Sequence, residues 1–320
     1  MKSKITTFAL LFLAFGTLHA QDDKYSFKEN YDISSPAYLN VAVSDGDVTV
    51  VPGKNGSIEV LYIVYFNNHF VDISKEELGK YMILDFKHNE NTLNISVHHR
   101  KPYNRKNRYE VSLKIYTPVQ TLCNLKSSDG DIEVSGLKAD QKCKTSDGDI
   151  VMKNISGNLD LHTSDGDIDI SKISGDIILK TSDGDVIVSG AEGTANLITS
   201  DGDIKLKEVT GAISAETSDG DITIRDCNGS LSAITSDGDI RGNLLKVTNK
   251  LSFRTSDGDI NITIPSGLGL NLKAKGETLR IPLMNFSGST EDHRIEGTIN
   301  GGGIPVEFIT TDGTITLSYL

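Results

Sequence analysis

The chain has 320 residues, a formal net charge of -12, 6% aromatic residues and no tryptophan. This length is enough for one large or two ordinary buried cores. The acidic balance argues against a nucleic-acid-binding protein, which would normally present a basic face, and the few aromatic rings make an extended stacking platform for sugars or bases implausible.

Residues 1–20 predict a secretory signal peptide. Lys2 and Lys4 form a basic start, and the apolar stretch 8–15 is too short to span a bilayer. Cleavage after Ala20 fits the need for a small residue, and no cysteine follows that could carry a lipid. No later segment is long and apolar enough to cross a membrane. We therefore expect an exported protein that is periplasmic, surface-associated or secreted.

Residues 21–120 predict an irregular, β-rich N-terminal cap with one short helix. The helix is expected from the capping box Ser74-Lys-Glu-Glu77 toward Lys80. The basic run 98–108 predicts a solvated loop, with an anion or glycan-phosphate site as the alternative. Its first two residues, His98 and His99, would point to opposite faces of a strand and so make a poor metal pair. Strands are expected at residues 40–50, 56–66, 82–87, 92–98 and 109–116.

A regular repeat occupies residues 121–264. The motif Ser-Asp-Gly-Asp begins at Ser128, Ser146, Ser164, Ser182, Ser200, Ser218, Ser236 and Ser256. The intervals are 18 residues, except for a final one of 20, for which we expect a bulged corner near residues 243–246. A further copy starts at Ser44, and a degenerate one covers residues 311–314. Such fixed self-similarity is typical of repeat architectures.

Apolar residues alternate with polar ones twice in each repeat, and the parity changes between the two runs. Each repeat therefore predicts two short strands and two corners. An antiparallel meander would leave one long apolar face uncovered, whereas a solenoid turns both apolar faces inward. We expect an all-β, parallel β-solenoid, similar to a β-helix or β-roll, with 18-residue coils. Residues 265–320 predict irregular C-terminal coils and a cap. The meander remains the alternative.

The chain has three cysteines, Cys123, Cys143 and Cys227, all at inward-facing positions. An odd number in an exported chain leaves at least one thiol unpaired within the molecule. We expect all three to be small buried apolar residues rather than parts of a disulfide framework.

The Thr-Ser-Asp-Gly-Asp-Ile repeats, together with Asn300-Gly-Gly-Gly303 and the following Thr-Thr-Asp-Gly-Thr-Ile, resemble the bacterial β-strand-repeat putative adhesin family. This is a domain of unknown function of exported and cell-envelope proteins, and the likeness runs from about residue 40 to residue 320. It implies a β-solenoid on the cell envelope. Family repeats often read Ser-Ser-Gly-Asp, so each full copy here carries an additional Asp, whose role cannot be transferred from the family.

In a solenoid the motif forms two columns of carboxylates. Neighbouring carboxylates within a column lie about 4.8 Å apart, the interstrand spacing. Each adjacent pair would repel by about 1 kcal/mol in water and about 3–4 kcal/mol at an effective dielectric near 20. The structural explanation is that corner backbone amides donate hydrogen bonds to the Asp side chains, with the motif Gly supplying a positive φ angle. The functional explanation is that divalent cations such as Ca²⁺ lie between the coils. The first column is Asp129, Asp147, Asp165, Asp183, Asp201, Asp219, Asp237 and Asp257. The second column is Asp131, Asp149, Asp167, Asp185, Asp203, Asp221, Asp239 and Asp259.

No nucleophile–base pair or phosphate-binding glycine loop is recognisable, and a repeated carboxylate ladder lacks the asymmetry of a catalytic pair. We expect a non-enzymatic, structural or adhesin-like envelope protein that presents an acidic surface, with a cell-surface glycan or an envelope protein as partner and no cofactor. The alternatives are a calcium-dependent binding module with sites on the Asp ladder and, third, a polysaccharide-acting β-helix enzyme.

Overall fold

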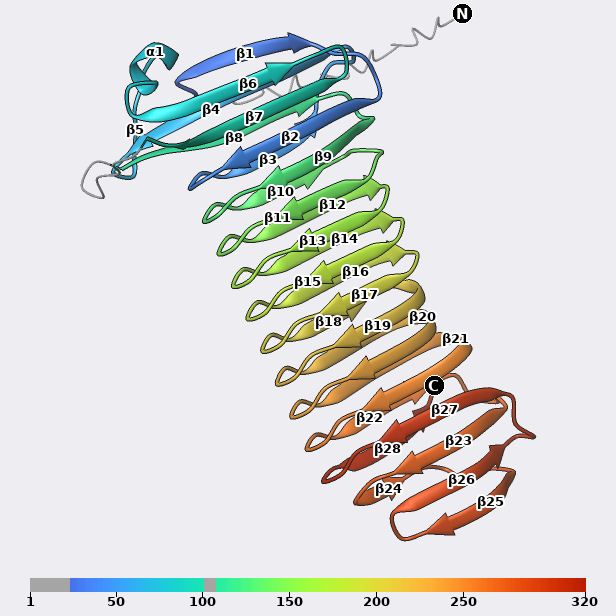
Figure 1. Ribbon diagram of the computed structural model, residues 1–320. Helices are drawn as coiled ribbons and strands as arrows, with labels where there is room; N and C mark the ends of the chain where they lie inside the picture. Colours follow the sequence, from blue (N-terminus) through green and yellow to red (C-terminus); the bar gives the residue numbers. More distant parts are fainter. Residues whose placement is uncertain (1–23, 101–107) are drawn as a thin grey trace, which may run out of the picture.

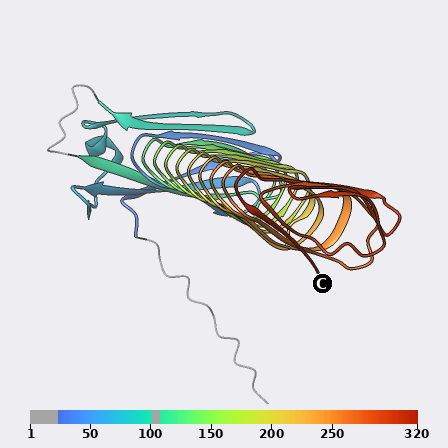
Figure 2. The ribbon, with the colours of Figure 1, turned by 90° about the horizontal axis from the view of Figure 1, so that it is seen from below.

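The computed structural model describes residues 24–100 and 108–320 (Figure 1). The predicted signal peptide at residues 1–20 lies outside this range. The described chain winds into a stack of coils with a sheet on each of two sides, and Figure 2 shows the coils nested one behind another between the two ends. No helix in the described part is long and apolar enough to span a membrane.

The pairing of strands shows that the solenoid prediction is right. Strand β12 (Ile150–Ser156) pairs in parallel with β14 (Ile168–Ser174), so that Ile150 lies opposite Ile168. Strand β13 (Leu159–His162) pairs in the same way with β15 (Ile177–Lys180). Partners are one repeat apart, and each coil contributes one strand to each sheet. A meander would instead place antiparallel strands side by side.

Each of the two sheets extends along the whole stack, strand after strand. The first contains β6 (Met82–His88), β7 (Thr92–His99), β2 (Ala37–Val43), β9 (Thr121–Lys126), β11 (Gln141–Lys144), β13, β15, β17 (Ala195–Ile198), β19 (Thr210–Glu216), β20 (Ile222–Ile234), β21 (Ile240–Arg254), β27 (Ile304–Ile309), β23 (Leu270–Lys275), β26 (Arg294–Ile299) and β25 (Phe286–Glu291). The second contains β1 (Phe27–Asp32), β4 (Ser57–Phe66), β8 (Tyr109–Thr117), β3 (Val48–Pro52), β10 (Ile132–Ser135), β12, β14, β16 (Val186–Glu192), β18 (Ile204–Lys207), β20, β21, β22 (Ile260–Ile264), β28 (Thr314–Tyr319) and β24 (Thr278–Arg280). Strands β20 and β21 continue round a corner into both sheets.

The core consists of columns of aliphatic side chains between the sheets. Ile150, Ile168, Val186 and Ile204 form one such column and are completely buried. Burial of each side chain contributes about 1.5–3 kcal/mol. The three cysteines are also buried and unpaired, as predicted. Burial raises the pKa of the Cys143 thiol well above its ordinary value, so this thiol stays protonated.

The N-terminal region contributes a coil as well as a cap. Strands β2 and β3 pair directly with β9 and β10, so residues 37–52 form the first coil of the stack. We had predicted these residues to be part of the irregular cap. Strands β7 and β8 extend the two sheets outward from it. Helix α1 (Lys75–Leu78) begins at the predicted cap, where the Ser74 side chain accepts a hydrogen bond from the Glu77 amide. Strand β5 (His69–Phe70) completes the hairpin on β4.

The C-terminal region closes the stack by returning on itself. After β22 the chain forms β23 and β24 two coil positions beyond β21 and β22, then the antiparallel hairpin β25–β26. It returns as β27 and β28, which fill the position between: β27 pairs with β21 and β23, and β28 pairs with β22 and β24. The last strands in sequence are therefore not the last in the stack (Figure 1).

The two extra residues of the 20-residue coil enter later than predicted. The register between β20 and β21 shifts by one residue before Leu244 and returns to 18 at Lys246. It then increases to 20 between Val247 and Leu251. The additional residues therefore lie in the exposed segment 248–250. At residues 243–246, where the bulge was predicted, the register shifts by one residue and then shifts back, so no residue is gained there.

Candidate functional site: the carboxylate ladder

The motif corner is built first by its buried threonine. The Thr145 hydroxyl lies 3.1 Å from the Ser128 carbonyl oxygen and 3.2 Å from that of Gly130, both in the preceding coil. The same pair of contacts recurs in every later coil up to Thr310. Because these hydroxyls are almost completely buried, each must find an acceptor inside the protein, and the previous corner supplies it.

The motif glycine allows successive corners to approach one another. A β-carbon on Gly202 would stand 1.9 Å from the carbonyl oxygen of Gly184, far inside van der Waals contact. We expected these glycines to supply a positive φ angle, and that expectation is wrong: none of the motif glycines has φ in the left-handed region. The glycine is required because the neighbouring backbone occupies the space of a side chain.

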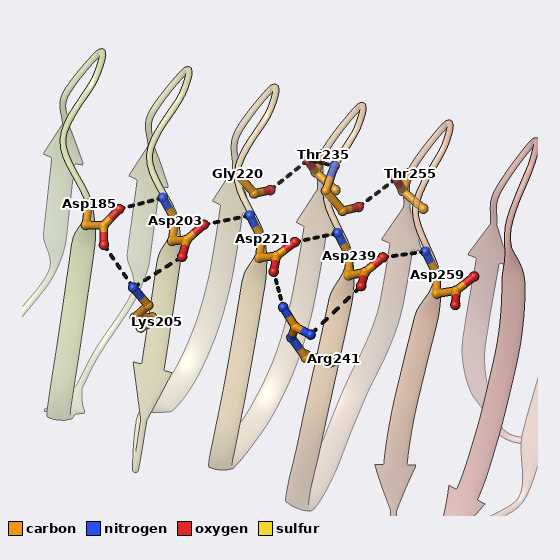
Figure 3. Close-up of polar contacts among 11 residues, drawn as sticks. Asp185, Asp203, Lys205, Gly220, Asp221, Thr235, Asp239, Arg241, Thr255 and Asp259 are labelled. Carbon is orange, nitrogen blue, oxygen red and sulfur yellow. Dashed lines mark hydrogen bonds and ion pairs between the residues drawn. The ribbon is translucent and has the colours of Figure 1, made fainter.

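The second Asp of each motif caps a backbone amide of the next coil. The Oδ1 atom of Asp185 accepts a hydrogen bond from the Asp203 amide at 2.8 Å, and Asp203 does the same for Asp221 at 2.9 Å (Figure 3). The series begins at Asp47 and ends with Asp259, which accepts from the Thr314 amide. These amides offset the repulsion within the column, as the structural explanation predicted.

Basic side chains partly neutralise the second column. The Lys205 ammonium lies 2.8 Å from Asp185 and 3.2 Å from Asp203, and Arg241 bridges Asp221 and Asp239 in the same way (Figure 3). Partial burial of Asp185 would raise the pKa of its carboxyl. The hydrogen bonds from Lys205 and from the Asp203 amide outweigh this effect, so the pKa is lowered.

The first Asp of each motif has no comparable role. All eight side chains, from Asp129 to Asp257, are exposed at the corner. Within the described residues, the one contact found for this column is Arg108 at 3.6 Å from Asp129. The backbone amide of each donates to the preceding coil, for example Asp201 to Ser182 at 2.9 Å, but the carboxylate points outward. The structure thus separates the two predicted columns into a capping column and an outward column.

Within residues 24–100 and 108–320, no group of three His, Cys, Asp or Glu side chains is arranged to hold a metal ion. Calcium needs six to eight oxygen ligands, and one oxygen of each capping carboxylate already accepts a backbone hydrogen bond. Calcium binding by the sixteen ladder carboxylates stays a prediction, which a chelation experiment can test.

The basic run lies mostly outside the described residues, since 101–107 are not among them. At its start, the His99 Nε2 atom lies 2.8 Å from the Asp45 carboxylate, and Arg108 at its end lies 3.3 Å from the same carboxylate. His98 lies 3.1 Å from the Ser96 hydroxyl instead. The two histidines thus have different partners, in keeping with the expectation that they face opposite sides.

A second ladder at the opposite corner was not predicted. The Asn158 amide donates to Asp140, the Asp176 amide to Asn158, and the Thr194 amide to Asp176, at 2.8–3.0 Å. The signal in the sequence is an Asp or Asn eighteen residues apart, directly before the second apolar run.

A column of left-handed residues also lies at this opposite corner. It contains Asn154, Lys172, Gly190, Glu208 and Asp226, with φ between 54° and 64°. Only the glycine and, less strongly, the Asn and Asp are suited to this conformation. The structure therefore holds Lys172 and Glu208 in a backbone conformation that their side chains disfavour.

The coils, ladders and caps define a capped parallel β-solenoid held together by hydrogen bonds between equivalent residues. The model of the Toastrack DUF4097 family matches residues 37–225 and 212–318, nearly all of the described chain. The chain belongs to this family. No curated protein gives a significant match.

Several solved structures match part of the chain. They include a putative adhesin from Parabacteroides distasonis ATCC 8503 (16% identity, 74% of this chain and 97% of that chain, TM-score 0.48) and a putative adhesin from Parabacteroides merdae ATCC 43184 (14%, 73% and 95%, 0.46). A third is a putative lipid binding protein from Parabacteroides distasonis ATCC 8503 (14%, 74% and 96%, 0.35). At these identities and TM-scores, the likeness says nothing about what the present chain does.

Proposed function

We propose that this chain is a non-enzymatic, adhesin-like protein of the cell envelope, exported by the predicted signal peptide, which uses the outward Asp column as a contact surface. The observation that supports this proposal is that the residues of the motif have different structural roles. The Thr217 hydroxyl contacts the coil before it, and Gly202 lets its corner approach that of Gly184. Asp203 accepts a hydrogen bond from the Asp221 amide of the next coil. Among the described residues, the outward Asp side chains make no contact of this kind with a neighbouring coil.

The outward column is suited to a contact surface because it is long, regular and rigid. Its carboxylates project at the interstrand spacing of about 4.8 Å from corners that are fixed by three kinds of contact. Apart from the Arg108 contact of Asp129, these carboxylates have no ion pair or hydrogen bond with the described residues. Their repulsion would be relieved by a cationic partner. A regular series of identical groups suits polyvalent attachment, in which many weak contacts add. It does not suit catalysis, which requires one carboxyl with a pKa distinct from its neighbours.

Attachment of the mature chain, residues 21–320, to intact cells and to arrays of glycans and envelope proteins tests this proposal. We expect attachment that weakens with added salt and falls at least tenfold when the eight outward Asp residues are changed to Asn. A matched control removes eight exposed carboxylates elsewhere and should attach normally: Asp72, Glu90, Glu192, Glu208, Glu216, Glu277, Glu291 and Asp292, changed to Asn or Gln. Absence of attachment, or an equal loss in both variants, would overturn the role of the column, and cell fractionation tests the location.

A further inference from the structure

A groove runs across the strands on the outer face of the first sheet, away from the Asp ladder. It crosses β2, β9, β11, β13 and β15, which follow one another along the stack (Figure 1), and has a volume of about 480 Å³. A second hollow of about 410 Å³ continues it toward β6 and β7 and shares Asn40 and Asn124 with it. At the interstrand spacing, five adjacent strands make the main groove about 20 Å long.

The floor of the groove combines apolar and amide groups with one ion pair, between Lys142 and Asp160. Tyr38 at one end is 41% exposed and Ile178 at the other is 48% exposed, with Leu122 next to the tyrosine. Asn40 donates a hydrogen bond to Asn94 at 3.0 Å. The Oδ1 atom of Asn124, one strand further on, is buried and has no hydrogen-bond partner in the described part of the chain. A buried acceptor of this kind favours a ligand that brings a donor, such as a hydroxyl group.

A column of basic side chains runs parallel to the groove. Lys126, Lys144, His162 and Lys180 occupy equivalent positions on β9, β11, β13 and β15, so they stack about 4.8 Å apart. They lie two residues along each strand from the groove's midline, which is about 6.6 Å and within reach of a lysine side chain.

Carboxylates do not neutralise the lysines of this column in the way that Lys205 and Arg241 partly neutralise the capping Asp column. His162 contacts Asp160, but among the described residues no carboxylate lies within ion-pair distance of Lys126, Lys144 or Lys180. On the other side of the groove, Asp140 and Asp176 each have one oxygen held by a backbone amide of the next coil. The charged side chains that line the groove are the Lys142–Asp160 pair and the two capped carboxylates. In a chain of net charge -12, three lysines beside this groove without an ion-pair partner among the described residues favour an anionic partner.

We propose that this groove binds an anionic oligosaccharide. The apolar faces of the sugar rings rest on Tyr38, Leu122 and Ile178, a hydroxyl donates to Asn124, and the carboxylate or sulfate groups pair with the lysine column. The groove lies on a sheet face whose backbone groups are already paired with neighbouring strands, so it lacks the free edge that an extended peptide would use. This inference rests on the proposed adhesive function, but it concerns a different surface from the outward Asp column.

Titration calorimetry of the mature chain with three hexasaccharides tests the proposal: one of uronic acids, one sulfated and one neutral. We expect binding of at least one anionic sugar, at least tenfold weaker binding of the neutral one, and salt-sensitive affinity. Lys126→Gln, Lys144→Gln and Lys180→Gln combined should reduce the affinity at least tenfold, and Tyr38→Ala should reduce it with little change in salt dependence. The control triple variant Lys207→Gln, Lys246→Gln and Lys250→Gln removes the same charge elsewhere and should bind as the wild type does.

Equal binding of the neutral sugar, equal binding of a hexaglutamate peptide, or equal losses in both triple variants would overturn the proposal. So would absence of binding to both anionic sugars by a chain whose circular dichroism shows that it is folded. If that chain still attaches to cells through its outward Asp column, the adhesive function stands and the groove inference alone fails. If it binds anionic sugars without attaching to cells, the reverse holds.

Discussion

The carboxylate of Asp149 accepts a hydrogen bond from the backbone amide of Asp167, eighteen residues later, at 2.8 Å. Asp167 in turn accepts from the amide of Asp185 at 2.7 Å. A side chain thus substitutes for a backbone carbonyl at a corner, where the strands themselves have ended. This corner, its counterpart on the opposite side and the charges along both can be tested by substitution, by pH and by removal of ions.

Removal of one capping carboxylate should destabilise the stack locally. We expect Asp167→Ala to lower the free energy of unfolding by about 1.5–3 kcal/mol, the range for hydrogen bonds to charged groups. Asp165→Ala, two residues earlier in the outward column, should change it by less than about 0.5 kcal/mol. Urea unfolding followed by circular dichroism gives both values. Equal losses would contradict the assignment of different roles to the two columns.

Addition of a methyl group at a motif glycine should be far more damaging than backbone strain alone. Gly202→Ala places a β-carbon against the Gly184 carbonyl, and we expect a loss of about 3 kcal/mol or more. Gly190→Ala is the control: its φ is +64°, but the nearest heavy atom of the described residues beyond its chain neighbours is the Lys172 amide nitrogen, at 3.9 Å from the new β-carbon. That variant should lose only about 1–2 kcal/mol. Urea midpoints in the reverse order would show that dihedral strain, and not close approach, selects these glycines.

Relief of the left-handed strain at Glu208 should stabilise the protein. Its φ is 55°, and its side chain is exposed, with Lys207 at 3.5 Å as its ion-pair partner. Glu208→Gly removes a cost of about 1–2 kcal/mol and adds about 0.5–1 kcal/mol of chain entropy, so we expect a net gain of roughly 0.5–1 kcal/mol. Glu216→Gly, in an ordinary strand conformation, should destabilise instead. Thermal unfolding of the two variants provides the comparison, and a loss at both sites would refute the strain argument.

The pairing of Lys205 with Asp185 should make part of the stability sensitive to acid. The folded-state pKa of Asp185 is lowered, so the native state releases its proton more readily than the unfolded chain does. The stabilisation is complete above the unfolded pKa of about 3.9 and is lost as the pH falls through the lower folded value. Lys205→Met should therefore reduce stability at pH 7 and have a smaller effect below pH 3. Urea titrations across this range test the sign, and a variant effect that grows toward low pH would contradict it.

Chelation of divalent ions should leave the fold intact. We expect the same thermal midpoint, within about 2 °C, in a chelator and in millimolar calcium, because the capping carboxylates are already held by backbone amides. A ligand that binds only the folded state stabilises it by RT ln(1 + [L]/Kd) at each site, so eight occupied sites would give a large shift. A chain that is unfolded in chelator and folds when calcium is added would favour the calcium-dependent module.

The sequence was sufficient to predict the coils because the eighteen-residue spacing and the alternation of apolar residues determine which faces turn inward. It could not distinguish a glycine selected for its dihedral angle from one selected by a neighbouring carbonyl, so Gly202 was misinterpreted. Lys172 gave no sign of its left-handed backbone, because local propensity opposes that conformation and only the stack imposes it. The capping role of Asp185 was one of two explanations that remained open, since the choice depends on distances between coils.

The return of β27 and β28 into the stack has a consequence for the order of assembly. Until residues 304–319 are present, the position between β21 and β23 is empty, and both neighbouring strands have unsatisfied backbone groups. The earlier coils can add one after another as the chain emerges, because each pairs with a predecessor that already exists. The final position must be filled by strand insertion between two partners. A chain that lacks its last sixteen or so residues would therefore have two open edges inside its body, each able to accept a strand from another molecule.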